Sequence, residues 1–183
     1  MIDPNGMGRN FFWWVQWTAD IVSDLVTWGN PVGGITNSYL ELAALVLHES
    51  CFPIVCSRPE WHATSTGSDN TPTVGWCFLE ASTGNPIVAD LLRIRADMNS
   101  GALLTPSVFY HPGTLNNRGD DASRRFDFPD NNFLSFFRSK YCPSQSAGSW
   151  TLCHPPTEIT LCVIYVLCRR MSRLETLPTT IRP

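Results

Sequence analysis

Hydrophobic and polar residues form alternating blocks along the first hundred residues, and these blocks predict a series of strands and helices. The aromatic run from Phe11 to Trp17 has the β-prone composition of a strand that is buried on at least one face. Ser38 and Glu41, three residues apart, have the form of a capping box, and apolar residues recur behind them at helical spacing. This pattern predicts a helix from about residue 37 to residue 51.

The middle of the chain continues this alternation. The expected elements are a short strand ending at Asp69, a helix from Asn70 to about Ala81, a helix from Ile87 to Asn99, a strand from Pro106 to Tyr110 and a short helix from Asp120 to Phe126. Pro72 would lie in the first turn of its helix, where proline is well tolerated. Strands that alternate with helices predict an α/β fold, here a mixed sheet of about four strands flanked by helices.

The two ends of the chain differ from this middle part. Turn residues from Asp3 to Gly6 come almost at the start, so we expect that the strand leading into this turn is missing. Beyond Asp127 the Pro, Ser and Gly content rises, and residues 143–149 have the composition of a linker. Thr157 follows two prolines and is expected to cap a last amphipathic helix to about Arg170. We therefore divide the chain into a domain over residues 1–126 and a linker with a terminal helix over residues 127–183.

Charge and cysteine content narrow the functional classes. The chain has 13 Lys and Arg against 16 Asp and Glu, so a net charge of −3 supplies no general attraction for nucleic acid. Seven cysteines without a CxxC pair predict reduced thiols in an intracellular protein that is not secreted. The apolar run from Ile159 to Cys168 is about half the length that crosses a bilayer, so we predict no membrane span.

Three acids lie where strands and helices meet. Glu41 is in the first turn of its predicted helix, Asp69 ends a strand, and Asp120 opens a helix after a strand. Carboxylates from separate elements can converge at one end of a sheet, and such a cluster binds Mg²⁺, which prefers oxygen ligands. Two such ions activate a water molecule and stabilise the leaving oxygen of a phosphodiester. The pattern therefore predicts a site for metal-dependent hydrolysis.

Three stretches resemble the RNase H domain that follows reverse transcriptase in eukaryotic retrotransposons. They are Thr36-Asn37-Ser38-Tyr39-Leu40-Glu41-Leu42-Ala43-Ala44, Ser68-Asp69-Asn70-Thr71-Pro72-Thr73-Val74, and His111-Pro112-Gly113 through Asn116 to Gly119-Asp120-Asp121-Ala122-Ser123-Arg124. They occur in the family's order and span roughly residues 1 to 126. The resemblance implies an RNase H-like fold in a polyprotein fragment, with RNA-DNA hybrids as the ancestral substrate and Mg²⁺ as the cofactor.

The resemblance also assigns roles to individual residues. Glu41 corresponds to the family's helix acid, Asp69 to its fourth-strand acid and Asp120 to its last acid, with Asp121 as the runner-up. The family's first-strand acid has no counterpart, although Asp3 is an alternative ligand. Arg124 and Arg125 are candidates to contact the phosphates of a hybrid, and the alternative is that they are solvated surface residues. The missing ligand predicts a degenerate domain that is inactive as a ribonuclease. Tyr39 in place of an acid and Gly119 in place of an alanine are further departures from the family's pattern.

Other interpretations of the same residues stay open at this point. Glu41 can be a capping-box acid, and Asp69 can be the N-cap of the helix that follows it. The domain can also be an active RNase H with a substitute first ligand, or a non-enzymatic interaction domain. Loss of an inner strand exposes backbone hydrogen-bonding groups, so we further expect self-association through the exposed sheet.

Overall fold

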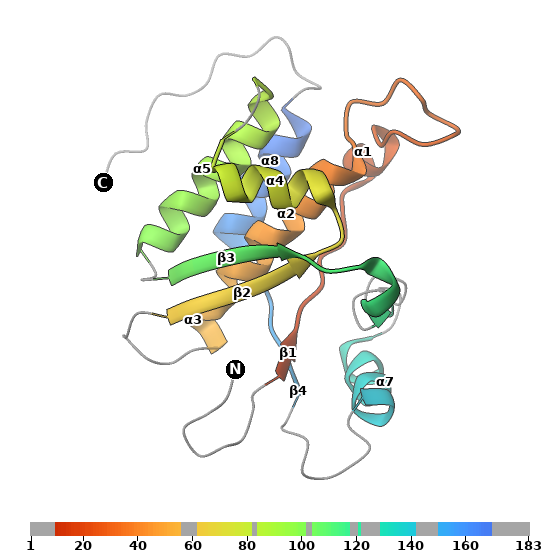
Figure 1. Ribbon diagram of the computed structural model, residues 1–183. Helices are drawn as coiled ribbons and strands as arrows, with labels where there is room; N and C mark the ends of the chain where they lie inside the picture. The colour runs from red at the N-terminus through yellow and green to blue at the C-terminus, as the bar shows by residue number, and fades with distance from the viewer. Residues whose placement is uncertain are drawn as a thin grey trace.

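The computed structural model describes residues 10–55, 62–81, 84–101, 104–117, 121, 129–141 and 150–169. Its elements are β1 (Asn10–Phe12), α1 (Ala19–Ser23), α2 (Asn37–Ser50), α3 (Phe52–Val55), β2 (His62–Ser68), α4 (Thr71–Leu79), α5 (Pro86–Gly101), β3 (Leu104–Tyr110), the 3-10 turn η1 (Gly113–Leu115), α7 (Asp130–Tyr141), β4 (Trp150–Leu152) and α8 (Thr157–Cys168). The mixture of helices and parallel strands confirms an α/β fold (Figure 1). The predicted helix over residues 120–126 lies mainly outside the described residues.

The described strands form two separate parallel pairs. β2 pairs with β3 in a register that runs from His62 opposite Leu104 to Ser68 opposite Tyr110, and α4 and α5 make the connection between them. β1 pairs with β4, which places Phe12 opposite Leu152. The expectation of one mixed sheet of about four strands is therefore wrong for this part of the chain.

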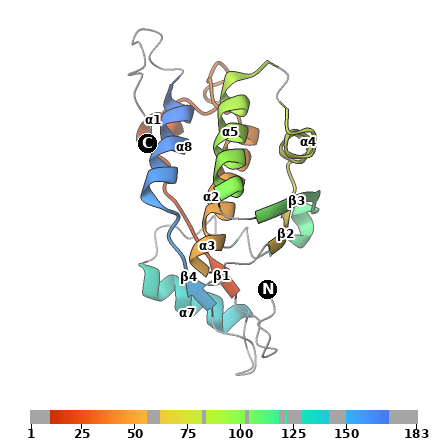
Figure 2. The ribbon, with the colours of Figure 1, turned by 90° about the vertical axis from the view of Figure 1, so that its left-hand side faces the viewer.

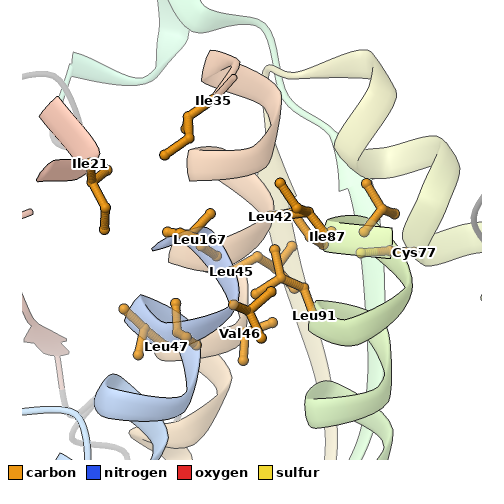
Figure 3. Close-up of a cluster of buried hydrophobic side chains, with 14 residues drawn as sticks. Ile21, Ile35, Leu42, Leu45, Val46, Leu47, Cys77, Ile87, Leu91 and Leu167 are labelled. Atoms are coloured by element: carbon orange, nitrogen blue, oxygen red, sulfur yellow. The ribbon is translucent and has the colours of Figure 1, made fainter. Parts of the chain in front are cut away.

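The main hydrophobic core lies between helices. α2, α5 and α8 pack side by side, with the β2–β3 pair on the other side of α2 and α5 from α8 (Figure 2). Leu42, Leu91 and Leu167, one from each of these helices, are completely buried (Figure 3). Full burial of a leucine side chain contributes about 1.5–3 kcal/mol, so this cluster is a main source of stability.

The terminal helix differs in two respects from its predicted form. It begins at Thr157 itself and its N-cap is Pro156, so the expectation that Thr157 caps the helix is wrong. Its side chains Val163, Val166 and Leu167 are buried in the same core as α2 and α5. The segment that we expected to be a linker and a terminal helix thus contributes a layer of the core.

A second, smaller cluster surrounds the β1–β4 pair. Phe12 of β1 packs against Phe133 and Phe137 of α7, with ring centroids 4.9 and 5.0 Å apart. The strand predicted from Phe11 to Trp17 is observed only as β1, because the chain beyond Phe12 leaves the pair and packs Trp13 and Trp17 against the helical core. α7 has no counterpart among the predicted elements.

One stretch of the described chain, Asn37–Val55, is long and apolar enough to cross a membrane by length and composition. Half of its most apolar window is buried inside the fold. The core helix of a globular protein passes the same test, and α2, which makes up most of this stretch, occupies such a position.

Candidate functional site

Glu41 lies beyond the first turn of α2 and does not cap it. The N-cap residue is Thr36, two positions before Ser38, so the predicted capping box is wrong. Ser38 has other partners: its hydroxyl accepts a hydrogen bond from the Asn70 side-chain amide at 3.1 Å, and its carbonyl accepts one from the Thr73 hydroxyl at 3.2 Å. These bonds attach the start of α2 to the start of α4, and they leave the Glu41 carboxylate without a capping role.

Asp69 does not cap a helix either. The N-cap of α4 is Asn70, whose side-chain oxygen accepts hydrogen bonds from the backbone N–H and the hydroxyl of Thr73, each at 3.0 Å. The backbone N–H of Asn70 in turn donates to the Ser68 hydroxyl at 3.2 Å. Asp69 is therefore held between the end of β2 and the capped start of α4, with its side chain exposed.

The structure brings Glu41 and Asp69 together. Burial raises the pKa of the Glu41 carboxyl, and the nearby negative charge of Asp69 raises it further. Asp69 directly follows the carboxyl end of β2, the edge at which parallel α/β sheets bind ligands, and the Asn70–Ser38 hydrogen bond joins the start of α2 to this region. Carboxylate oxygens are the ligands that hard cations such as Mg²⁺ prefer.

Gly113 provides the space that the Asp69 side chain occupies. A Cβ atom at position 113 would lie 2.5 Å from Oδ2 of Asp69, closer than any real contact of this kind. Gly113 opens η1 three residues after the end of β3, so the turn that follows β3 packs against Asp69, the acid that follows β2. The sequence analysis identified the Pro112-Gly113 turn but did not predict that Gly113 lies against Asp69.

The remaining predicted site residues are not brought to this pair within the described residues. Asp120, Arg124 and Arg125 lie outside them. Asp121 is held by α7 instead: its carboxylate accepts a hydrogen bond from the Tyr141 hydroxyl at 2.6 Å and forms an ion pair with Lys140. In the part of the chain that is described, no group of three or more His, Cys, Asp or Glu side chains is placed to hold a metal ion.

Two neighbouring residues have structural roles. Tyr39, which stands where an acid was expected, accepts a hydrogen bond from the Asn85 side chain at 2.5 Å and stacks on Trp76 with centroids 6.1 Å apart. His111 donates its backbone N–H to the Ser68 carbonyl at 2.9 Å, and its Cβ lies over Gly67. Both contacts tie strand or helix ends to one another at the edge of the candidate site.

No protein-family model, no curated protein and no solved structure matches this chain. The resemblance to retrotransposon RNase H domains therefore rests on the three sequence stretches alone.

Proposed function

We propose that this chain is a degenerate retroelement RNase H-like domain that keeps a two-carboxylate cation site and has lost the two-metal centre. Its ancestral activity is the hydrolysis of RNA in RNA-DNA hybrids. The observation that supports this proposal is the convergence of Glu41 and Asp69, together with the finding that Thr36 and Asn70 are the caps. Neither Glu41 nor Asp69 therefore serves as a helix cap, which was the alternative interpretation of both acids.

The carboxylates of Glu41 and Asp69 are suitable ligands for one hard cation such as Mg²⁺. Glu41 and Asp69 supply carboxylate oxygens from two elements, and Mg²⁺ commonly binds through one or two carboxylates while its other ligands are water molecules. Burial is the main cause of the raised pKa of Glu41, and cation binding would offset the smaller contribution, the repulsion from Asp69. A second metal ion requires further carboxylates, and Asp121 is already engaged by Lys140 and Tyr141. In an intact enzyme of this class the pair of ions activates the attacking water and stabilises the leaving oxygen.

Thermal unfolding with and without Mg²⁺ tests the cation site. Saturating Mg²⁺ should stabilise the parent chain by about 1–3 kcal/mol, because the ion binds the folded state alone. Asp69→Asn should lose this effect, whereas Asp97→Asn, which changes an exposed acid on α5, should retain it. Equal Mg²⁺ responses in all three proteins would contradict a metal site and favour a non-enzymatic interaction domain.

A cleavage assay tests the loss of activity. We expect the purified chain to release no more product from a labelled RNA-DNA hybrid than Asp69→Asn does, in Mg²⁺ or in Mn²⁺. Metal-dependent cleavage that Asp69→Asn abolishes would contradict degeneracy and indicate a substitute for the first-strand ligand, for which Asp3 is the candidate. In that case the contribution of Arg124 and Arg125 to hybrid binding can be measured in the same assay.

A further inference from the structure

β2 has a free edge that lacks the usual protection against strand pairing. β3 covers one side of β2, and no strand in the described chain pairs with the other side (Figure 1). From Ala63 to Ser68 the strand contains no charged residue and no proline, the two devices that most often prevent edge-to-edge association.

The orientation of the backbone groups identifies which residues face this edge. The backbone N–H of His111 donates to the Ser68 carbonyl, so Ser68 faces β3. Backbone groups of successive residues in a strand point to opposite sides, so Thr64 and Thr66 face β3 as well, while Ala63, Ser65 and Gly67 face the free edge. By the same alternation, Pro106 of β3 faces the edge that points away from β2. Proline has no backbone N–H to offer an incoming strand, so it protects this edge. β3 is thus protected and β2 is not.

Two buried hydroxyl groups on β2 have no hydrogen-bond partner. These are Oγ1 of Thr64 and Oγ1 of Thr66, which lie on the face of the sheet that is turned toward the helices. A buried hydroxyl without a partner costs about 1–3 kcal/mol, so two of them on adjacent positions of one face require an explanation. The side chains on the opposite face, Ala63 and Ser65, are small and exposed.

We propose that a second copy of this chain pairs with β2 as an antiparallel strand, in the register that places Ser65 opposite Ser65 of the other copy. In this register Ala63 lies opposite Gly67 of the other copy. The backbone N–H and C=O groups of Ala63, Ser65 and Gly67 all form hydrogen bonds with the residues opposite them. Thr64 then lies opposite Thr66 of the other copy in a non-hydrogen-bonded pair, in which side chains approach most closely. Threonine pairs in such positions form hydroxyl hydrogen bonds, so all the unpartnered hydroxyls obtain partners.

The occupant follows from this self-complementarity. A two-fold axis beside Ser65 places the backbone N–H and C=O groups and the threonine hydroxyls of β2 opposite matching partners on the second copy. Because residues 63–68 carry no charge, two copies of the strand approach each other without like-charge repulsion. Residues directly opposite each other share a face, so both helical layers lie on the same side of the joined sheet. The proposal does not depend on the cation site.

Cross-linking of cysteine variants tests the register. Opposed residues in a hydrogen-bonded pair have Cα atoms about 5.5 Å apart, within the range for a disulfide. Ser65→Cys should therefore form a covalent dimer in oxidised glutathione, beyond any background from the parent's seven cysteines. Ala63→Cys should not, because its opposing residue is Gly67. Equal cross-linking of the two variants, or none by Ser65→Cys, would overturn the proposal.

Sedimentation velocity over a range of concentrations tests association without cross-linking. The parent should form dimers, and Ser65→Pro should be a folded monomer, since proline is tolerated at a free edge but removes the central N–H. Thr64→Val with Thr66→Val should raise the dimer dissociation constant roughly tenfold or more. In a monomer the same double change would stabilise the chain by removing two unpartnered hydroxyls. A parent that is monomeric at every concentration would overturn the proposal.

Discussion

The indole N–H of Trp13 donates to Nδ1 of His48 at 3.0 Å. This bond joins the segment after β1 to the last turns of α2, and the His48 ring also stacks on Phe11, with centroids 5.5 Å apart. Nδ1 accepts this hydrogen bond only when it carries no proton. The contact therefore requires a neutral imidazole at this nitrogen and makes the packing of the N-terminal segment sensitive to pH.

Burial lowers the pKa of His48 from 6.5 to about 4 in the folded chain. Between these values the unfolded chain binds a proton that the folded chain does not, so stability falls as the pH falls from 6.5 to 4. The shift corresponds to about 3 kcal/mol across this range. Urea unfolding of the parent and of His48→Gln between pH 4 and 7.5 measures it. A parent that loses no more stability than the variant would contradict this linkage.

The elements that the sequence predicted well are those defined by local patterns. α2 was expected over residues 37–51 and is observed over Asn37–Ser50, because its apolar spacing is repeated over several turns. The start of α2 was read wrongly, since a Ser and a Glu three residues apart fit more than one register. The register is decided by Asn70, 32 residues away, which hydrogen-bonds Ser38. No local pattern contains that information.

The candidate site shows the same limit. The prediction that Glu41, Asp69 and Asp120 form one site stays a prediction, because Asp120 lies outside the described residues, although the charge of Asp69 lies close enough to act on Glu41. The partners of Asp121 could not be predicted, since Lys140 and Tyr141 belong to a helix that the sequence did not reveal. The β1–β4 pair was also missed, because three-residue strands 140 positions apart leave no periodic signal.

The burial of α8 predicts that its inner residues are essential for stability. Leu167 is fully buried against α2 and α5, whereas Leu161 on the same helix is 60% exposed. Leu167→Ala should cost about 2–5 kcal/mol because it removes buried apolar volume and leaves a cavity. Leu161→Ala should change the free energy of unfolding by less than about 0.5 kcal/mol. Chemical denaturation of both variants makes the comparison, and similar losses would contradict the position of α8 in the core.

Gly113→Ala tests the geometry of the acidic pair without removing either acid. The new Cβ would meet Oδ2 of Asp69, the far end of a flexible and exposed side chain, so the carboxylate can move away at little cost. Stability without divalent cations should therefore change little, while the stabilisation by Mg²⁺ should fall. Gly75→Ala on α4 is the matched control, because a Cβ there meets nothing within 4 Å. Equal Mg²⁺ responses in the two variants would contradict the role of Gly113.

A buried ion pair between α2 and α5 gives the last prediction. Glu49 is completely buried and receives two hydrogen bonds from Arg95 at 2.9 Å, one to each carboxylate oxygen, and one from the Asn99 side chain at 2.9 Å. The pair therefore joins α2 to α5 inside the core through a buried, hydrogen-bonded charge pair. Its removal from one side leaves a buried charge without its partner.

Arg95→Met should accordingly destabilise the chain by about 3–5 kcal/mol, and Glu49→Leu by a similar amount. The double variant should recover much of this loss, because neither charge then remains buried. Arg93→Ala is the control: its ion pair with Asp90 is exposed, and its loss should cost less than about 1 kcal/mol. Urea unfolding of these four variants beside the parent completes a double-mutant cycle with its control, and additive losses in the double variant would show that the two side chains do not depend on each other.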